Sequence, residues 1–407
     1  MSKHIIIFLK FENFSRIVNE GLPSHLYEKT LITNDSALLE KCKDHYHHFL
    51  YAEQLSSPQV VDFVMSLHAI KHVDGVFSPS EDLVEFLAFL RKQLGITDGV
   101  VGDDAVFFRN KVEMKNRLAQ DKVILIPRYC TVYRFENAVD FLNSKSSEAI
   151  IKPVDGAGSL NTYRVNLSNI NDYFDLLNNN SGKYEIEEFI EGSMFHLDSI
   201  IHKNEIVFTS VARYTHSTLE CRDGRPLCGY FLPDHYDPLI KNLISANTDL
   251  LNSMPIKDGV THAELIVTPD QEIYFCEVAA RIAGGGIIFG IEATTGVNVL
   301  TEGARTFVGE PPIFKGRFPQ TYGGYVLLYK KKGRVKQITQ SSEFLQIKGV
   351  KRADILAKAG DELNFSGSSG DVVGVVTWSA DSFADNDRIR SEIERLWSLE
   401  VEEAVIL

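Results

Sequence analysis

The chain has 407 residues, of which 44% are hydrophobic and 24% are charged, and its formal net charge is -13. This length exceeds one compact core and predicts two or three domains, and the ordinary composition argues against extensive disorder. The acidic balance argues against a protein that wraps nucleic acid or lies on an anionic membrane, because both partners require a basic surface.

The cysteines and the N-terminus indicate a reduced compartment. The five cysteines are scattered and form no C-x-x-C pair, so neither a disulfide framework nor a zinc knuckle is expected. The N-terminal run HIIIFL is followed at once by Lys10 and Glu12, which predicts a buried strand rather than a secretion signal. No apolar run approaches the roughly 20 residues of a membrane-spanning helix. We therefore expect a cytoplasmic protein.

Residues 1–109 are expected to form an α/β domain. Apolar runs of strand length, HIIIFL and DGVF, alternate with helical segments, and this alternation predicts a parallel sheet. The helix after the second strand carries start signals, with Ser78 placed to cap it and Glu81 placed to complete a capping box. No G-x-G-x-x-G follows the first strand, so a dinucleotide-binding fingerprint is missing.

The pattern changes at Asn110. A helix, KVEMKNRLAQ, precedes a second helical stretch at residues 137–142, and strands and hairpins then mix without strict alternation. This mixture predicts an α+β region, which we divide into residues 110–190 and 191–310. Residues 311–407 contain the expected antiparallel strands GGYVLLY, GRVKQI and DVVGVVTWSA, and a helix is expected from Asn386 to Leu399.

A first candidate binding motif is AIIKPVDGAGS. An apolar strand delivers Lys152 next to a loop of small residues that contains Gly156, Gly158 and Ser159. An ammonium group beside exposed backbone N–H groups is suited to phosphate oxygens. The motif is not a Walker A loop, which needs G-x-x-x-x-G-K-[ST] before a helix. An ordinary turn at the end of a strand is the alternative interpretation.

A second candidate is EIEEFIEGSMFHLD. Glu187, Glu188, Phe189 and Ile190 are expected to end a strand just before a turn. A hinge of this kind between two lobes can present backbone N–H and C=O groups to the edge of a planar base. A purely structural strand is the alternative.

The stretch THAELIVTPDQEIYFCEVAARIAGGG places two glutamates on a predicted hairpin. If residues 268–271 form the loop, Val267 pairs with Glu272, and Glu264 and Glu277 become diagonal neighbours on one face, roughly 7 Å apart. This register sets the first glutamate opposite Phe275 and the second opposite His262. Carboxylates this close repel unless a cation or a proton lies between them, and oxygen ligands favour magnesium over zinc. A solvent-facing hairpin is the alternative.

An arginine and three glycines follow this hairpin. Arg281 offers a planar fork for carboxylate or phosphoryl oxygens, and Gly284, Gly285 and Gly286 allow a ligand to approach the main chain. A structural salt bridge of the arginine is the alternative.

In this order along the chain, the motifs resemble the ATP-grasp superfamily, in which two lobes clasp ATP and magnesium ions. The phrases IIKPVDGAGS, EEFIEGSMFHLDSII and THAELIV...EVAARIAGGG are most similar to those of L-amino acid ligases, which join unprotected amino acids into dipeptides. The resemblance implies an N-terminal Rossmann-like (pre-ATP-grasp) α/β domain, a two-lobed ATP-grasp fold and a small C-terminal β-rich subdomain.

The resemblance also implies roles for residues by position. The implied ATP-binding residues are Lys111, Lys152, Gly156, Gly158, Ser159, Glu187, Glu188, Phe189, Ile190 and Asp198. The implied metal ligands are Glu264 and Glu277, and the implied catalytic residues are Arg281 and Lys152. The implied substrate-binding residues are Arg281, Gly284, Gly285, Gly286 and His262.

Two positions depart from the pattern of the family. Met194 stands where many relatives carry a glutamate for the ribose hydroxyls, so this role either passes to Asp198 or is absent. Ala279 stands where many relatives carry the asparagine of an E-x-N-x-R motif, so the resemblance leaves one metal contact unassigned, and the similarity implies that this departure is common among amino acid ligases.

The activity that the resemblance implies is ATP-dependent ligation of two amino acids through an acyl phosphate, with release of ADP and phosphate. It implies Mg²⁺, or Mn²⁺ in its place, small-molecule substrates and a homodimer. Alternative acceptors are a natural-product amine and a carrier-protein thiol. A non-catalytic nucleotide-binding module and a biotin-type carboxylase are further alternatives.

Overall fold

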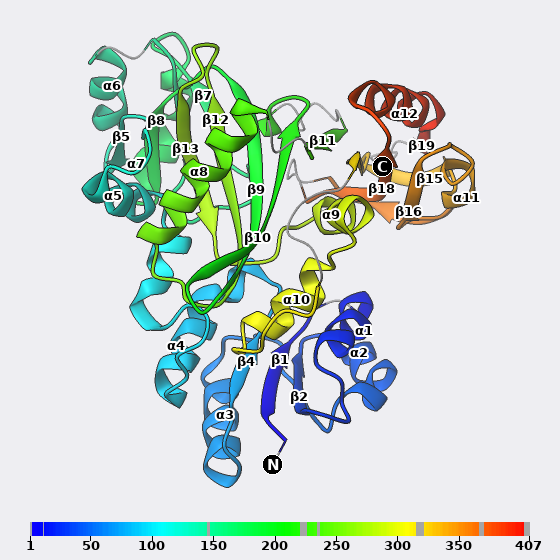
Figure 1. Ribbon diagram of the computed structural model, residues 1–407. Coiled ribbons are helices and arrows are strands. Elements are labelled where there is room, and N and C mark those ends of the chain that lie inside the picture. Colours follow the sequence, from blue (N-terminus) through cyan, green and yellow to red (C-terminus); the bar gives the residue numbers. More distant parts are fainter. Residues whose placement is uncertain are drawn as a thin grey trace, which may run out of the picture.

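The computed structural model describes residues 2–10, 12–144, 147–219, 226–233, 237–314, 321–365 and 370–402. These residues form an α/β domain, a small four-stranded lobe and a large antiparallel sheet (Figure 1). This arrangement confirms the predicted fold class. Within the described ranges, no helix is both long enough and apolar enough to cross a membrane.

The N-terminal domain is built on a parallel sheet with strand order β3-β2-β1-β4. Every residue of β1 is buried, as expected for a parallel sheet whose two faces are both covered by helices. The strands are β1 (His4–Phe8), β2 (Glu28–Thr33), β3 (His48–Tyr51) and β4 (Gly75–Phe77), and the helices are α1 (Glu12–Gly21), α2 (Ser36–Lys41), α3 (Pro58–Ile70) and α4 (Val84–Leu94).

The predicted capping box after β4 is wrong. A short 3-10 turn precedes α4, and the Ser78 hydroxyl accepts a hydrogen bond from the backbone of Ser80 at 3.2 Å. The Glu81 carboxylate instead accepts hydrogen bonds from Arg109 and Arg281. Two guanidinium groups are stronger partners for a carboxylate than one backbone N–H group, which explains why Glu81 turns away from the helix.

The small lobe carries the first lysine motif. Its sheet has strand order β5-β8-β6-β7, and one face packs on a buried core that includes Val132, Ile151 and Ile186. The opposite face holds Lys152 and Glu187. The elements are α5 (Lys111–Asp121), β5 (Tyr129–Val132), α6 (Phe135–Asn143), β6 (Ala149–Pro153), β7 (Tyr163–Val165), α7 (Phe174–Asn179) and β8 (Tyr184–Glu188).

The large sheet has eight strands in the order β13-β12-β9-β10-β11-β14-β18-β16. Backbone hydrogen bonds between β11 and β14 cross the boundary expected at residues 310 and 311, so the C-terminal strands extend the sheet of the preceding lobe. Its strands are β9 (Ser193–His202), β10 (Glu205–Tyr214), β11 (Leu227–Phe231), β12 (Gly259–Val267), β13 (Ile273–Ala279), β14 (Tyr322–Tyr329), β16 (Val350–Ile355) and β18 (Val372–Ala380).

The remaining elements complete the chain. They are the helices α8 (Pro238–Ser253), α9 (Ile287–Thr295), α10 (Val299–Thr306), α11 (Ser341–Phe344) and α12 (Phe383–Leu396), and the strands β15 (Gly333–Ile338), β17 (Glu362–Leu363) and β19 (Leu399–Glu402). The predicted C-terminal helix is confirmed but ends earlier, because Leu399 pairs with Ile338 in a three-stranded sheet.

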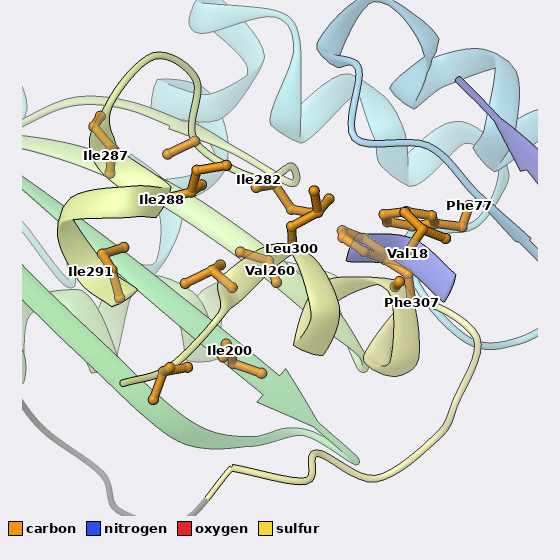
Figure 2. Close-up of a cluster of buried hydrophobic side chains, with 14 of the residues drawn as sticks. Val18, Phe77, Ile200, Val260, Ile282, Ile287, Ile288, Ile291, Leu300 and Phe307 are labelled. Atoms are coloured by element: carbon orange, nitrogen blue, oxygen red, sulfur yellow. The ribbon is translucent and has the colours of Figure 1, made fainter. Parts of the chain in front are cut away.

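One apolar core joins the N-terminal domain to the large sheet. Figure 2 shows Phe77 and Val18 beside Phe307 of the loop after α10, with Ile200 and Val260 of the large sheet nearby. Helix α1 approaches α10 so closely that a Cβ atom on Gly21 would lie 2.5 Å from the Thr301 carbonyl oxygen. This continuous packing fixes the position of the N-terminal domain, including Glu81, relative to the rest of the chain.

Candidate active site

A cavity of about 840 Å³ lies between the small lobe, the large sheet and the C-terminal strands. It brings together most of the residues that the sequence singled out. The predicted residues that line it are Lys111, Lys152, Gly156, Gly158, Ser159, Glu187, Glu188, Phe189, Ile190, His262, Glu264, Glu277, Arg281, Gly284 and Gly285. Asp198 and Gly286 are not among the lining residues.

The two glutamates of the hairpin lie directly opposite each other, so the predicted diagonal register is wrong. Val267 pairs with Ile273, because Gln271 adopts a left-handed conformation with φ of 66° and lengthens the loop by one residue. A bulge at Cys276 then shifts the pairing again, so that Glu264 pairs with Glu277. Both side chains therefore lie on the same face of the hairpin, and both line the cavity.

Glu277 is held as a carboxylate by positive neighbours. Burial alone would raise the pKa of Glu277, but Lys111, whose Nζ lies 3.1 Å from Glu277 Oε2, and Lys152 lower it to about 2. Glu264 accepts a hydrogen bond from the Tyr214 hydroxyl at 2.9 Å. The pair presents oxygen atoms only, on one face of one hairpin. Such a donor set fits a hard divalent cation.

Lys152 belongs to a buried cluster that the sequence reasoning found only in part. Its Nζ lies 2.6 Å from Glu187 Oε1, and the other oxygen of this carboxylate lies 2.5 Å from Lys115 Nζ. Lys115 also donates to Glu185 Oε1 at 2.7 Å. Burial alone would lower the pKa of Lys152, but Glu187 and its acidic neighbours raise it well above the ordinary value. The lysine therefore carries its charge at the cavity wall.

Lys115 and Glu185 were missed, although the sequence contains a signal for them. Lys111 and Lys115 are one helical turn apart on α5, and Glu185 and Glu187 are two residues apart on β8. Each spacing places its two side chains on one face of the element. The sequence does not reveal that these two faces meet.

The loop of small residues is held at its base by two cationic side chains. Lys111 donates to the Gly156 carbonyl oxygen at 2.6 Å, and Arg109 donates to the Asp155 carbonyl oxygen at 2.7 Å. Gly158 and Ser159 both adopt left-handed conformations, with φ of 63° and 54°. The Ser159 hydroxyl donates to Thr218 Oγ1 at 3.0 Å across the cavity.

Arg281 is oriented by the N-terminal domain. Its Nε donates to Glu81 Oε2 at 2.7 Å, and its Nη1 donates to the Ile282 carbonyl oxygen at 3.1 Å. Burial opposes the charged form, yet Glu81 raises the pKa of Arg281 above its ordinary value. The salt bridge expected as an alternative thus exists, and the side chain still lines the cavity. Glu81 is a second residue that the sequence reasoning missed, because it was assigned to a helix cap.

The hinge residues lie where β8 leaves the small lobe. The side chain of Glu187 faces the lysine cluster, whereas Glu188 Oε2 lies 3.3 Å from Arg128 Nε. Phe189 and Ile190 follow the strand in the cavity wall. The Arg164 guanidinium covers the Phe189 ring at 3.9 Å. Apolar and backbone groups at this edge are suited to a planar base.

The structure does not bring Asp198 to the cavity, contrary to the expected ribose contact. Both of its oxygens lie near imidazole nitrogens, at 2.7 Å from His196 Nδ1 and 2.9 Å from His262 Nδ1. The sequence alone does not predict that Asp198 contacts two histidines, because one of these contacts requires Asp198 on β9 to pair with His262 on β12.

His262 connects this buried group to the site. Burial works against its charged form, but Asp198 raises the pKa of His262 to about 10. Its Nε2 lies 3.6 Å from Glu264 Oε1. Ligand atoms of His196, Asp198 and His262 lie within 4.8 Å of one another, but the hydrogen bonds of Asp198 already explain this grouping.

The three glycines lie against the C-terminal strands. Gly285 has φ of 63°, and a Cβ atom on it would lie 3.0 Å from Leu327. A Cβ atom on Gly286 would lie 2.9 Å from Val375, so Gly286 packs directly against β18, and it is not among the lining residues. This part of the cavity is lined by side chains of β14 and β18, in which the sequence identified no individual site residue.

Two family models match the chain. Residues 108–285 match the ATP-grasp domain, and residues 326–398 match the L-amino acid ligase C-terminal domain 2. The fold and the site therefore define an ATP-grasp protein, a class that uses ATP and divalent metal ions.

Individual relatives agree with this assignment. The L-arginine-specific L-amino acid ligase of Bacillus subtilis is 25% identical over 366 residues, which cover 85% of this chain and 87% of the relative. The crystal structure of an L-amino acid ligase from Bacillus licheniformis has a TM-score of 0.79 at 18% identity, and the match covers 99% of both chains. The chain therefore contains an ATP-grasp domain and an L-amino acid ligase C-terminal domain 2, and it is similar to L-amino acid ligases over most of its length.

Other ATP-grasp enzymes share the fold. The biotin carboxylase domain of the 2-oxoglutarate carboxylase from Hydrogenobacter thermophilus, solved with MgADP and bicarbonate, has a TM-score of 0.71 at 13% identity. The match covers 98% of this chain and 91% of that chain. At this identity the likeness extends to the fold alone.

Proposed function

We propose that this chain joins two amino acids into a dipeptide through an acyl phosphate, using ATP and Mg²⁺, with Mn²⁺ as an alternative ion. The observation that carries the proposal is that one cavity contains two lysines for phosphates, two opposed carboxylates for a divalent ion and an oriented arginine. A protein that only binds a nucleotide has little use for the complete set.

The first chemical step activates a carboxylate. A carboxylate oxygen of the first amino acid attacks the γ-phosphorus, and the bond from that phosphorus to the β-γ bridging oxygen breaks, so ADP leaves. Lys152 and Arg281 supply positive charge that stabilises the oxygens of the transferred group. A divalent ion bound by Glu264 and Glu277 would supply further charge stabilisation. Lys111 holds the base of the phosphate loop through the Gly156 carbonyl oxygen.

The second step forms the amide bond. The free amine of the second amino acid attacks the acyl carbon, loses a proton, and displaces phosphate together with the oxygen that came from the carboxylate. Arg281 is assigned to the developing oxyanion. The loop that contains Gly156, Gly158 and Ser159 is assigned to covering the phosphates, because water inside the cavity would hydrolyse the acyl phosphate.

A substrate screen tests this proposal. The protein is incubated with ATP, Mg²⁺ and all pairs of amino acids, and phosphate release and products are measured together. At least one pair should stimulate phosphate release and yield a dipeptide in equal amount. If no pair stimulates release above the background with ATP alone, the dipeptide proposal fails.

The same assay separates the alternatives. Product masses distinguish a dipeptide from an acylated amine or a carrier-protein thioester, and bicarbonate-dependent phosphate release would indicate a carboxylase. A cytoplasmic location and a homodimer are also part of the proposal, and gel filtration with light scattering tests the latter.

A further inference from the structure

The lysine cluster at the nucleotide side of the cavity contains equal numbers of opposite charges. Lys115 and Lys152 supply two positive charges, and Glu185 and Glu187 supply two negative charges. The side chains of Lys115 and Glu185 are fully buried, and those of Lys152 and Glu187 are only 7% and 8% exposed. The cluster as a whole is therefore neutral.

The positions of the four groups give them different roles. Lys152 and Glu187 line the cavity, whereas Lys115 and Glu185 are absent from its lining and lie behind them. Glu187 bridges the two lysines through its two oxygens. Glu185 Oε1 lies 2.7 Å from Lys115 Nζ and 3.7 Å from Lys152 Nζ. Its closer partner is therefore Lys115, which does not line the cavity.

Lys115 has no route to the substrates. It lies on α5 one turn after Lys111, and its Nζ lies 5.1 Å from the centre of the Tyr129 ring. Burying an ammonium group costs several kcal/mol unless carboxylates and hydrogen bonds compensate. A buried methionine or leucine would fill this space at lower cost, so a charge here calls for another explanation.

We propose that Lys115 is a positioning residue that neutralises the excess negative charge of Glu185 and Glu187 and thereby leaves Lys152 available to the phosphates of ATP. This inference rests on the proposed nucleotide role of Lys152. Without Lys115, one lysine would face two carboxylates, and the cluster would carry one negative charge next to an anionic ligand.

The proposal predicts that two isosteric substitutions differ in their effect on the Kd for ATP. In Lys115→Met the cluster becomes negative, and the Kd for ATP, measured with Mg²⁺ and without amino acids, should rise about tenfold, in line with one buried charge several ångströms away. In Glu185→Gln the cluster becomes positive, and the Kd should stay equal or fall. In the double variant the cluster is neutral again, and the Kd should return to within about threefold of the unaltered protein.

Two controls separate positioning from general damage to the fold. Lys29→Met removes another fully buried lysine, in the N-terminal domain, and should leave the Kd for ATP unchanged. The KM for the amino acids should stay constant in Lys115→Met while the KM for ATP rises. Circular dichroism before and after heating identifies variants that do not fold.

The outcomes decide the proposal in every case. Equal weakening by Lys115→Met and Glu185→Gln, with no recovery in the double variant, would overturn it. If Lys115→Met does not fold, Glu185→Gln and the double variant still test it, because tenfold weaker ATP binding by either folded variant would contradict it. If the unaltered protein does not bind ATP, the proposed function itself fails. This result differs from those that support or contradict the role of Lys115, because those require an unaltered protein that binds ATP.

Discussion

Two regions of the molecule each bury a complete lysine side chain, but in different surroundings. Lys29 of β2 lies in the N-terminal domain, where Asn19 Oδ1 and the Leu22 carbonyl oxygen accept its hydrogen bonds. Lys115 of α5 lies beside two carboxylates at the nucleotide side of the cavity. Within the described ranges, no carboxylate lies within ion-pair distance of Lys29.

The difference shows what neighbouring charges do to a buried group. Burial lowers the pKa of Lys29 to about 7, so this lysine loses its proton easily. At the nucleotide side, carboxylates hold Lys152 in its charged form and raise its pKa. The N-terminal domain therefore tolerates a neutral amine for packing, whereas the cavity maintains positive charge for a ligand.

The largest expected effect comes from removing a carboxylate of the cavity. Glu277→Ala should lower turnover at least a thousandfold, because it removes half of the oxygen donors proposed for the divalent ion. The fold should persist, since Lys111 retains the Gly156 carbonyl oxygen as a partner. Steady-state phosphate release measures the loss. Glu272→Ala, an exposed position on the same hairpin, is the matched control, and unchanged turnover in Glu277→Ala would exclude the proposed metal role.

An intermediate effect is expected where the two regions meet. Glu81→Gln keeps the shape of the side chain but weakens its hydrogen bonds with Arg281 and Arg109, so kcat should fall about 10- to 100-fold. The KM for ATP should change little, because Glu81 contacts no predicted nucleotide residue. The neighbouring exposed Asp82, which pairs with Lys10, provides the control Asp82→Asn. Equal kcat values for the two variants would show that Glu81 does not orient the arginine.

The smallest effect on activity is expected at Lys29, which instead influences the stability of the N-terminal domain. The folded pKa of Lys29 is about 7 and the ordinary value is 10.5, so between these values the unfolded chain binds more protons than the folded one. The contribution of Lys29 to the free energy of unfolding therefore rises with pH across this window, by up to about 1.4 kcal/mol per pH unit, and is constant below pH 7.

Comparison of two denaturation series isolates this contribution. The unfolding free energy of the unaltered protein minus that of Lys29→Met should increase between pH 7 and pH 10, as measured by urea denaturation. A difference that stays flat would show that Lys29 remains charged in the folded protein. Catalytic activity at pH 7 should be the same for both proteins, which would sharpen the contrast with Lys115.

The fold and most of the site follow from patterns that act locally. Alternation of strands and helices predicts the parallel N-terminal sheet, and the spacing of small residues after Lys152 predicts the phosphate loop. The predicted hairpin is present, but its register depends on the backbone of Gln271 and on a bulge at Cys276. Glutamine does not require a left-handed backbone, and cysteine does not require a bulge. The alternation of apolar and polar residues along the two strands therefore could not predict which residues pair.

The residues that the sequence reasoning missed act through tertiary contacts. Glu81 follows a serine and a proline in a typical helix start, and only the folded chain brings Arg281, 200 positions away, to its carboxylate. Asp198 is assigned to a ligand by its position in a motif, but two histidines enclose it. Charged residues on one face of a helix or strand indicate that the face contacts oppositely charged side chains. The sequence alone does not identify the element that carries those side chains.

The central claim is that a carboxylate is activated by direct transfer of the γ-phosphoryl group of ATP, and an isotope measurement tests it most directly. An amino acid labelled with ¹⁸O in its carboxylate is incubated with ATP, Mg²⁺ and the second amino acid, and the released phosphate is analysed by mass spectrometry. Our account predicts that one labelled oxygen enters each phosphate released. Dipeptide formation with unlabelled phosphate, or labelled oxygen recovered in AMP, would contradict the account.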